Sequence, residues 1–320
     1  MLCYQRNDRI GEVYIMAMIG VQTGGLTRLY GIDGAYRAIR EAGFDAADVN
    51  LDELLPYRDI LDQKRPPVFS STFEECYFHP YRAAAEKYGI VNAQAHAPFP
   101  SWVADFDKAG DYNEYLLHVM EITIAGCACI GCKKLVVHPF FGTYENMLSE
   151  EAEWELNKSA YAHLIPAAKK WGVTILLENM FVRHRGKIYQ ACCSDFHQAA
   201  RYVDVLNELA GEKIFGFCMD TGHALLVGKD IKHALTALGS RIEAFHIHDN
   251  NGIDDQHLAP YMGVLDWDRF VEGLREIGYH GHLSFETHGT VERAFDPELV
   301  PEALRLIARS GRMFAERAGV

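Results

Sequence analysis

The chain has 320 residues, 49% of them hydrophobic, and its 31 Lys and Arg stand against 44 Asp and Glu, for a formal charge of -13. This length suits one large domain or two smaller ones, and a barrel commonly uses it as one. The negative charge disfavours nucleic acid and anionic membranes as partners, because both are bound through Lys and Arg. The sequence contains no stretch typical of a secretory signal or a membrane span, so we expect a cytoplasmic protein.

The first fifteen residues fit the rest of the chain poorly. Strand-like sequence begins near Met16 or Met18, in MAMIGVQT, and either methionine could be the start of translation. We therefore interpret residues 1–15 as a leader outside the fold and residues 16–320 as a single domain. No Pro/Ser-rich linker or low-complexity tract divides that domain.

Strand-like and helix-like segments alternate through the rest of the chain. Eight apolar runs predict strands: MIGVQT, DAADVNL, VNAQAH, KKLVVH, VTILLE, FGFCMD, RIEAFHIH and HLSFE. Segments of helical periodicity follow them, at 33–43, 73–89, 113–125, 150–172, 194–211, 229–239, 265–278 and 297–319. Residues 179–193 are expected to form a loop. Eight βα units in series predict an α/β fold, the (β/α)8 TIM barrel.

Three of the eight cysteines form the run CACIGC, with Cys127, Cys129 and Cys132. The spacing superficially resembles a thiolate metal site, but no second cysteine pair with suitable spacing accompanies it. The run lies between a helical pattern and the strand KKLVV, where small residues suit close helix–sheet packing. We therefore interpret these cysteines as packing residues.

Six of the predicted strands end in a histidine or a carboxylate: His96, His138, Glu178, Asp220, His246 and Glu286. An ionisable residue at the end of a buried strand costs free energy unless it is paired or bound to a metal. In a barrel, the carboxyl ends of all strands meet at one mouth, which is where active sites lie. Six such residues in series therefore predict a metal site at the mouth.

Four of the six come from successive strands and form the predicted metal-ligand set: Glu178, Asp220, His246 and Glu286. An oxygen-rich set with one imidazole suits a hard or borderline divalent cation. We expect one divalent metal, Mn²⁺ in the first place, with Mg²⁺, Co²⁺ and Zn²⁺ as alternatives.

Further polar residues lie close to this set in the sequence. His223 follows Asp220 by three positions in DTGHA, and His248 follows His246 by two in HIHDNNG, so each pair can reach one site. The residues expected to contact substrate are His96, His138, His223 and His257. Those expected to be additional metal ligands, or to orient the ligands, are Asp255, His248 and Asp249.

The segment after the fifth strand is locally basic, with Arg183, His184, Arg185 and Lys187. It could hold a phosphate or a carboxylate through bidentate arginine contacts. We favour the alternative, a solvated loop or a subunit contact. Aromatic residues near strand ends could stack on a sugar or cover the pocket: Phe140, Phe141, Trp102 and Tyr261.

As a set, the motifs HAPF, VVHPF, LLENM, MDTGHA, FHIHDNNG, the DQH run with YMGVLDW, and GYHGHLSFET resemble the xylose-isomerase-like TIM barrels. That group holds sugar and sugar-phosphate isomerases and epimerases, inosose dehydratase, and endonuclease IV. The resemblance extends from the first strand to the last. It is specific for the superfamily and not for a substrate.

Two branches of the group imply different chemistry. In ketose 3-epimerases, residues matching Glu178, Asp220, His246 and Glu286 bind one metal, the two glutamates move protons, and the match of His223 contacts substrate. Those enzymes also carry an Arg shortly after the HIHDNN equivalent, near where this chain has Gly252. Endonuclease IV holds three zinc ions, and this chain has a match for each of its nine ligands: His96, His138, Glu178, Asp220, His223, His246, Asp255, His257 and Glu286.

The acidic charge favours the first branch. We predict a divalent-metal-dependent isomerase or epimerase that acts on a sugar or sugar-like substrate through a metal-bound enediolate, with Glu178 and Glu286 as proton carriers. A dehydratase or lyase using the same enediolate of an inosose or oxidised glycoside is an alternative, and so is a trinuclear zinc phosphodiesterase. The expected partner is a small carbohydrate, without nucleic acid or membrane, and a homo-oligomer or partner subunit stays open.

Overall fold

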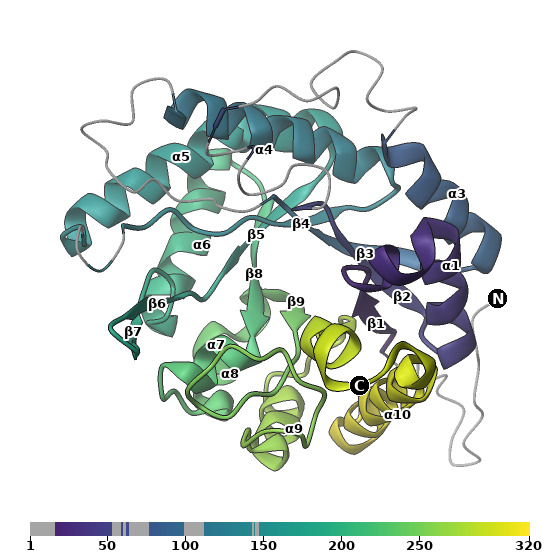
Figure 1. Ribbon diagram of the computed structural model, residues 1–320. Helices are drawn as coiled ribbons and strands as arrows, with labels where there is room; N and C mark the ends of the chain where they lie inside the picture. The colour runs from purple at the N-terminus through teal and green to yellow at the C-terminus, as the bar shows by residue number, and fades with distance from the viewer. Residues whose placement is uncertain are drawn as a thin grey trace, which may run out of the picture.

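The computed structural model describes residues 17–52, 59, 62–63, 77–98, 112–142, 144 and 147–320. Eight parallel strands form a barrel, with helices around its outside (Figure 1). The strands, in their order around the barrel, are β10 (Leu283–Phe285), β1 (Ile19–Gln22), β2 (Ala46–Asn50), β3 (Val91–His96), β4 (Lys134–Val136), β5 (Thr174–Glu178), β8 (Phe215–Asp220) and β9 (Ile242–His246). The predicted (β/α)8 barrel is therefore confirmed.

The barrel closes between β9 and β10, just beyond the end of β9. The amide of Ile247 donates to the carbonyl of Ser284 at 2.9 Å, and the amide of Glu286 donates to the carbonyl of Ile247 at 3.1 Å. These bonds bring Glu286 beside the end of β9. The last residue of the last strand thus faces the same mouth as the earlier strand ends.

The outer layer consists of α1 (Leu26–Ala42), α3 (His79–Tyr88), α4 (Tyr112–Cys129), α5 (Glu150–Trp171), α6 (Phe196–Ala210), α8 (Ile231–Leu238), α9 (Trp267–Glu276) and α10 (Val300–Ala318). Shorter elements are α7 (Thr221–Leu226), the 3₁₀ turns Gly239–Arg241 and Pro297–Leu299, and a π-helical turn, Thr290–Ala294. Several helices begin at a side-chain oxygen that accepts from a first-turn amide, as at Ser149, Asp195, Asp230 and Asp266. None of the helices described is long and apolar enough to cross a membrane.

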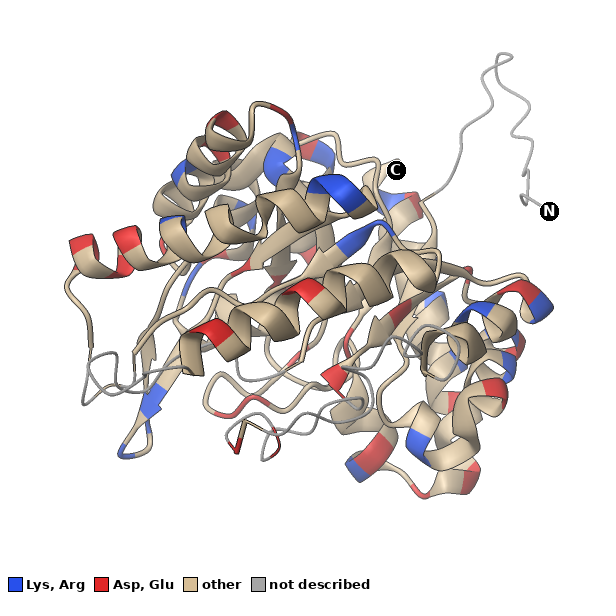
Figure 2. Cartoon of the chain, turned by 90° about the horizontal axis from the view of Figure 1, so that it is seen from above, with Lys and Arg blue, Asp and Glu red and all other residues tan. Residues whose placement is uncertain are grey.

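The expectation of a loop at 179–193 was wrong. Residues Phe181–His184 (β6) pair antiparallel with Lys187–Gln190 (β7). Arg185 and Gly186 between them have φ of 48° and 75°, the left-handed backbone of a two-residue hairpin turn. The hairpin projects beyond the barrel, and Lys and Arg colour its tip blue (Figure 2).

Two helices are longer than predicted. The helix predicted at 33–43 begins at Leu26, with a kink at Gly31, and the helix predicted at 113–125, α4, continues to Cys129. Cys127 and Cys132 are buried, and both thiols approach the carbonyl of Lys134, at 3.7 and 3.3 Å. This placement fits their interpretation as packing residues. The proposed leader, and part of the predicted 73–89 helix, lie outside the described residues.

The strand interiors are apolar on one side of the barrel and polar on the other. Val136, Leu176, Cys218 and Ala244, from β4, β5, β8 and β9, form a small cluster separate from the main core. In β1, β2 and β3, by contrast, Gln22 pairs in register with Asp48, and Asp48 with Gln94. All three side chains are buried. Buried polar groups need partners, and these three find theirs toward the barrel mouth and in the barrel interior.

Candidate active site

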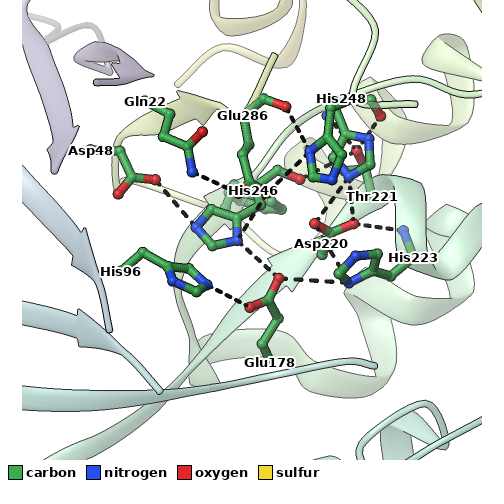
Figure 3. A network of polar contacts seen from close by, with 12 residues as sticks. Gln22, Asp48, His96, Glu178, Asp220, Thr221, His223, His246, His248 and Glu286 are labelled. Carbon is green, nitrogen blue, oxygen red and sulfur yellow. Dashed lines mark hydrogen bonds and ion pairs between the residues drawn. The ribbon is translucent and has the colours of Figure 1, made fainter. Parts of the chain in front are cut away.

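The six predicted strand-end residues lie together in two groups that share Glu178. Figure 3 shows all of them except His138. Each of β3, β5, β8 and β9 ends at its polar residue, while His138 lies two positions beyond β4 and Glu286 one beyond β10. The cavity has a volume of about 630 Å³, and its walls include His96, His138, Glu178 and Glu286. The prediction that these strand ends converge is thus matched by the geometry.

The predicted metal-ligand set forms one compact group. One ligand atom from each of its members lies within 4.8 Å of every other, the members being Glu178, Asp220, His246 and Glu286. The Nδ1 atom of His246 is 2.9 Å from Oε1 of Glu178 and 3.5 Å from Oε2 of Glu286. All four residues are buried. Three carboxylates held together away from water repel one another, so this donor set fits a divalent cation.

The electrostatics keep two of these carboxylates, Glu178 and Asp220, ionised. Burial alone would raise the pKa of Glu178, but the imidazoles of His246 and His138 outweigh it and hold the pKa well below its usual value. The pKa of Asp220 is lowered in the same way, by His223 and His248 against the effect of burial. Ionised carboxylates are the form that binds a metal.

A second group joins the first through Glu178. The Nε2 atoms of His96 and His138 are 2.9 Å apart, and Nε2 of His138 is 3.1 Å from Oε2 of Glu178. Burial lowers the pKa of His138, which favours its neutral form. The pKa of His96, by contrast, is raised well above its usual value by Asp52 and Glu178 against the effect of burial. The neutral imidazole of His138 beside Glu178 can hold either a second cation or a hydroxyl of a polyol.

A third group lies on the other side of Asp220 and comprises His223, His248, Asp255 and His257. The Nε2 atoms of His257 and His223 are 3.0 and 3.6 Å from Oδ2 of Asp255. The rings of His248 and His257 stack at 4.1 Å. Nδ1 of His223 donates to the carbonyl of Asn179 at 2.9 Å, which leaves Nε2 for the pocket.

Some predicted residues lie elsewhere. The carboxylate of Asp249 accepts from the amide of Leu265 and from Nε1 of Trp267, at 3.0 and 3.2 Å, and so fastens the loop between β9 and α9. It belongs to none of the potential metal-binding groups among the described residues. Tyr261 is 55% exposed and packs near Trp267. Trp102 lies outside the described residues.

Three other predicted residues, Arg183, Phe141 and Phe140, line the pocket or lie behind its lining. Arg183 lines the pocket and donates to the carbonyl of Ile253 at 2.8 Å, with Asp254 Oδ1 at 3.2 Å. Phe141 also lines the pocket, and Phe140 is buried against Tyr161.

The pocket residues that sequence reasoning missed include Gln22 and His288. Nε2 of Gln22 donates to Oε1 of Glu286 at 2.7 Å, while Oε1 of Gln22 is buried without a hydrogen-bond partner in the described part of the chain. His288 packs its ring 4.0 Å from that of His257. Burial, reinforced by His257, lowers the pKa of His288 to about 2, so it is neutral. A signal existed for both, since Gln22 ends its strand and His288 follows Glu286 by two residues.

Comparison with known proteins identifies the class. A model of the xylose isomerase-like TIM barrel family matches residues 36–310, and the chain belongs to this family. An inosose isomerase of Bacillus velezensis is 28% identical over 166 residues, 50% of this chain and 55% of that protein. An inosose dehydratase of Erwinia tasmaniensis is 25% identical over 244 residues, 68% and 76% of the two chains. Among solved structures, a 3-keto-D-glucoside 4-epimerase from E. coli has a TM-score of 0.67 and 22% identity, covering 92% of this chain and 99% of that one.

The close approach of His248 to the turn after β8 gives one prediction. A Cβ atom on Gly222 would lie 1.9 Å from Cε1 of His248, so alanine cannot be accommodated without displacing that ring. We expect Gly222→Ala to lower the free energy of unfolding by about 1–3 kcal/mol. In a double-mutant cycle with His248→Ala, most of this loss should disappear, because the clash is removed. Chemical denaturation measures it, and additive losses would contradict the steric explanation.

The imidazoles of the third group predict how stability of the metal-free protein depends on pH. Burial lowers the pKa of His223 and His257, but Asp220 and Asp255 raise the former to about 10, and Asp255 and Glu286 raise the latter to about 9. Both lie above the value of about 6.5 in an unfolded chain. Their stabilisation is therefore complete below pH 6.5 and is lost as the pH rises through 9 and 10.

We accordingly expect the Tm in the presence of a chelator to fall between pH 6.5 and 9.5, and to fall less in His223→Asn. His280→Asn, at an exposed histidine, is the matched control and should follow the wild type. A wild-type Tm that is flat over this range would contradict the assignment.

Proposed function

We propose that this protein is a divalent-metal-dependent isomerase or epimerase of a sugar or sugar-like substrate. The observation that carries the proposal is the placement of two buried carboxylates, Glu178 and Glu286, on the same pocket and against the same ring nitrogen of His246. Related proteins named inosose isomerase and 3-keto-D-glucoside 4-epimerase act on such substrates, and both names describe isomerisation or epimerisation next to a carbonyl group.

The bound cation would be held by Glu178, Asp220, His246 and Glu286 and would stabilise negative charge on a substrate carbonyl oxygen as a neighbouring proton is removed. We expect Mn²⁺, as the oxygen-rich donor set favours it, with Mg²⁺, Co²⁺ and Zn²⁺ as alternatives.

The protein's own residues would move the protons. Glu178 and Glu286 approach from different strands, so one can take the proton from carbon while the other returns it. Gln22 holds Oε1 of Glu286, which keeps this carboxylate turned into the pocket. The unpartnered Oε1 of Gln22 can accept from a substrate hydroxyl. His96, His138, His223 and His257 would contact the remaining hydroxyls.

The test is exchange of a carbon-bound proton with solvent. Incubation in D₂O with a panel of ketoses, inososes and 3-keto-glycosides, followed by NMR, should show deuterium at a carbon next to the carbonyl of one class. Product analysis then separates the outcomes: an isomer or epimer supports the proposal, and loss of water or of a glycosyl group indicates the dehydratase or lyase alternative. Absence of exchange across the panel would argue against proton-transfer chemistry.

One observation favours a second candidate, a trinuclear zinc phosphodiesterase. The described residues contain four groups of potential ligand atoms, each compact enough to hold a cation; the fourth, besides the three groups above, is His257, Glu286 and His288. The charge of -13 argues against a polynucleotide substrate. Elemental analysis distinguishes the two: about one metal per chain supports the isomerase, and three zinc ions with cleavage at abasic sites support the phosphodiesterase.

A further inference from the structure

A continuous chain of buried polar side chains runs from the opposite end of the barrel to the ligand set. Nε2 of His282, just before β10, contacts Oε1 of Gln94 on β3 at 2.6 Å. Nε2 of Gln94 donates to Oδ2 of Asp48 on β2 at 2.7 Å. The same carboxylate oxygen lies 3.2 Å from Nε2 of His246 on β9 as an ion-pair contact (Figure 3), and the described residues give that nitrogen no hydrogen-bond partner of regular geometry. Asp48, Gln94 and His246 have no exposed surface, and His282 is 5% exposed.

The chemistry of the groups orients each link in this chain. A carboxylate only accepts hydrogen bonds, so the amide nitrogen of Gln94 must face Asp48, and its oxygen must face His282. His282 therefore carries a proton on Nε2. Burial lowers the pKa of His282 to about 4, so the ring is neutral and this is its one proton. The hydrogen bonds among Asp48, Gln94 and His282 thus have one consistent assignment of donors and acceptors.

The other end of the chain acts on His246. A carboxylate facing Nε2 favours a proton on that nitrogen. With Nε2 facing Asp48, Nδ1 is the nitrogen left for a cation, and Nδ1 is the atom that approaches Glu178 and Glu286 at 2.9 and 3.5 Å. The ring is thereby presented in the tautomer and orientation that a metal ligand needs.

We propose that Asp48 is a positioning residue, which holds the proton of His246 on Nε2 and directs Nδ1 at the cation, and that Gln94 and His282 hold Asp48 in place. This inference rests on the metal site of the proposed function but on no particular substrate. A purely structural role accounts poorly for the arrangement, because Oδ1 of Asp48 is buried without a hydrogen-bond partner among the described residues. The interior side chains of β4, β5, β8 and β9 form an apolar cluster instead.

The first test is metal affinity, measured by calorimetric titration of the metal-free protein with Mn²⁺. We expect Asp48→Ala to weaken binding about 10–100-fold, the range typical when the partner of a ligating histidine is lost. Asp48→Asn should have a smaller effect, because its amide oxygen can still accept from His246. Gln94→Leu, which leaves Asp48 in place but unsupported, should also weaken binding. It keeps the test valid if Asp48→Ala does not fold.

The second test reads the tautomer directly. In the Zn²⁺-loaded wild type, ¹⁵N NMR of the histidine rings should show His246 protonated at Nε2 and bound at Nδ1, and Asp48→Ala should lose this signature. Tyr36→Phe is the matched control, because it breaks another buried hydrogen bond, to Oδ1 of Asn92 at 2.6 Å, far along the chain from the ligands. It should cost stability and leave the Mn²⁺ affinity unchanged.

Two results would overturn the inference. In the first, the wild type binds Mn²⁺, and the Kd values of Asp48→Ala and Gln94→Leu for Mn²⁺ lie within twofold of the wild-type Kd. This result would leave the proposed function standing. The other is a wild type that binds no divalent cation, which would remove the proposed function as well.

Discussion

Glu286→Gln is expected to reduce deuterium exchange into the substrate by about 10³-fold, within the range that a general acid or base contributes. The amide keeps the size of the side chain and can still contact Gln22, but it can neither take nor return a proton. Because Glu286 also belongs to the proposed ligand set, metal content must be measured in parallel. The NMR assay should be run with Mn²⁺ in excess, so that a lower affinity does not by itself remove the signal.

Glu298→Gln is the matched control for this variant. Glu298 lies in the same segment after β10, but it is exposed and belongs to none of the potential metal-binding groups among the described residues. It should exchange protons at the wild-type rate. Full exchange in Glu286→Gln, with its metal bound, would show that this carboxylate carries no proton.

Removal of the metal is expected to abolish turnover and to lower the Tm. Without a cation, the buried carboxylates Glu178, Asp220 and Glu286 repel one another and are balanced only by neighbouring imidazoles. A cation at 100 times its Kd stabilises the folded state by about 2.7 kcal/mol, so the Tm should rise by several degrees when Mn²⁺ is restored. Dialysis against a chelator, followed by stepwise return of Mn²⁺, measures activity and Tm on the same sample.

Asp220→Asn should reproduce the metal-free behaviour at low Mn²⁺, since Asp220 belongs to the proposed ligand set but is not one of the proposed proton carriers. Asp204→Asn is its control, because Asp204 is exposed and pairs with Arg241 on the outside of the barrel. Full activity in a preparation shown by elemental analysis to contain no metal would refute the metal-dependent mechanism.

Local sequence was enough to place the elements that carry the main ligand set. The runs VTILLE, FGFCMD and EAFH are mostly apolar and each finishes on an ionisable residue, and the strands do end at those residues, Glu178, Asp220 and His246. Such a pattern is readable because burial along a strand leaves its end as the first position where a charge can be paired. The hairpin at 181–190 escaped prediction, since its mixed polar and apolar residues pair with each other beside the barrel rather than within it.

The sequence by itself therefore determined the barrel, its family and the end of the barrel at which the polar strand-end residues gather, because these follow from patterns within single strands. Only the tertiary structure showed which side chains lie in contact. Glu178 belongs to two of the potential metal-binding groups, and Asp48 lies next to His246. Asp48 and Gln94 are 46 residues apart, and Gln94 and His282 are 188 apart. In the sequence, each of these looks like an isolated polar residue in or beside an apolar strand. Their meaning depends on closure of the barrel, which brings distant strands into contact around one interior.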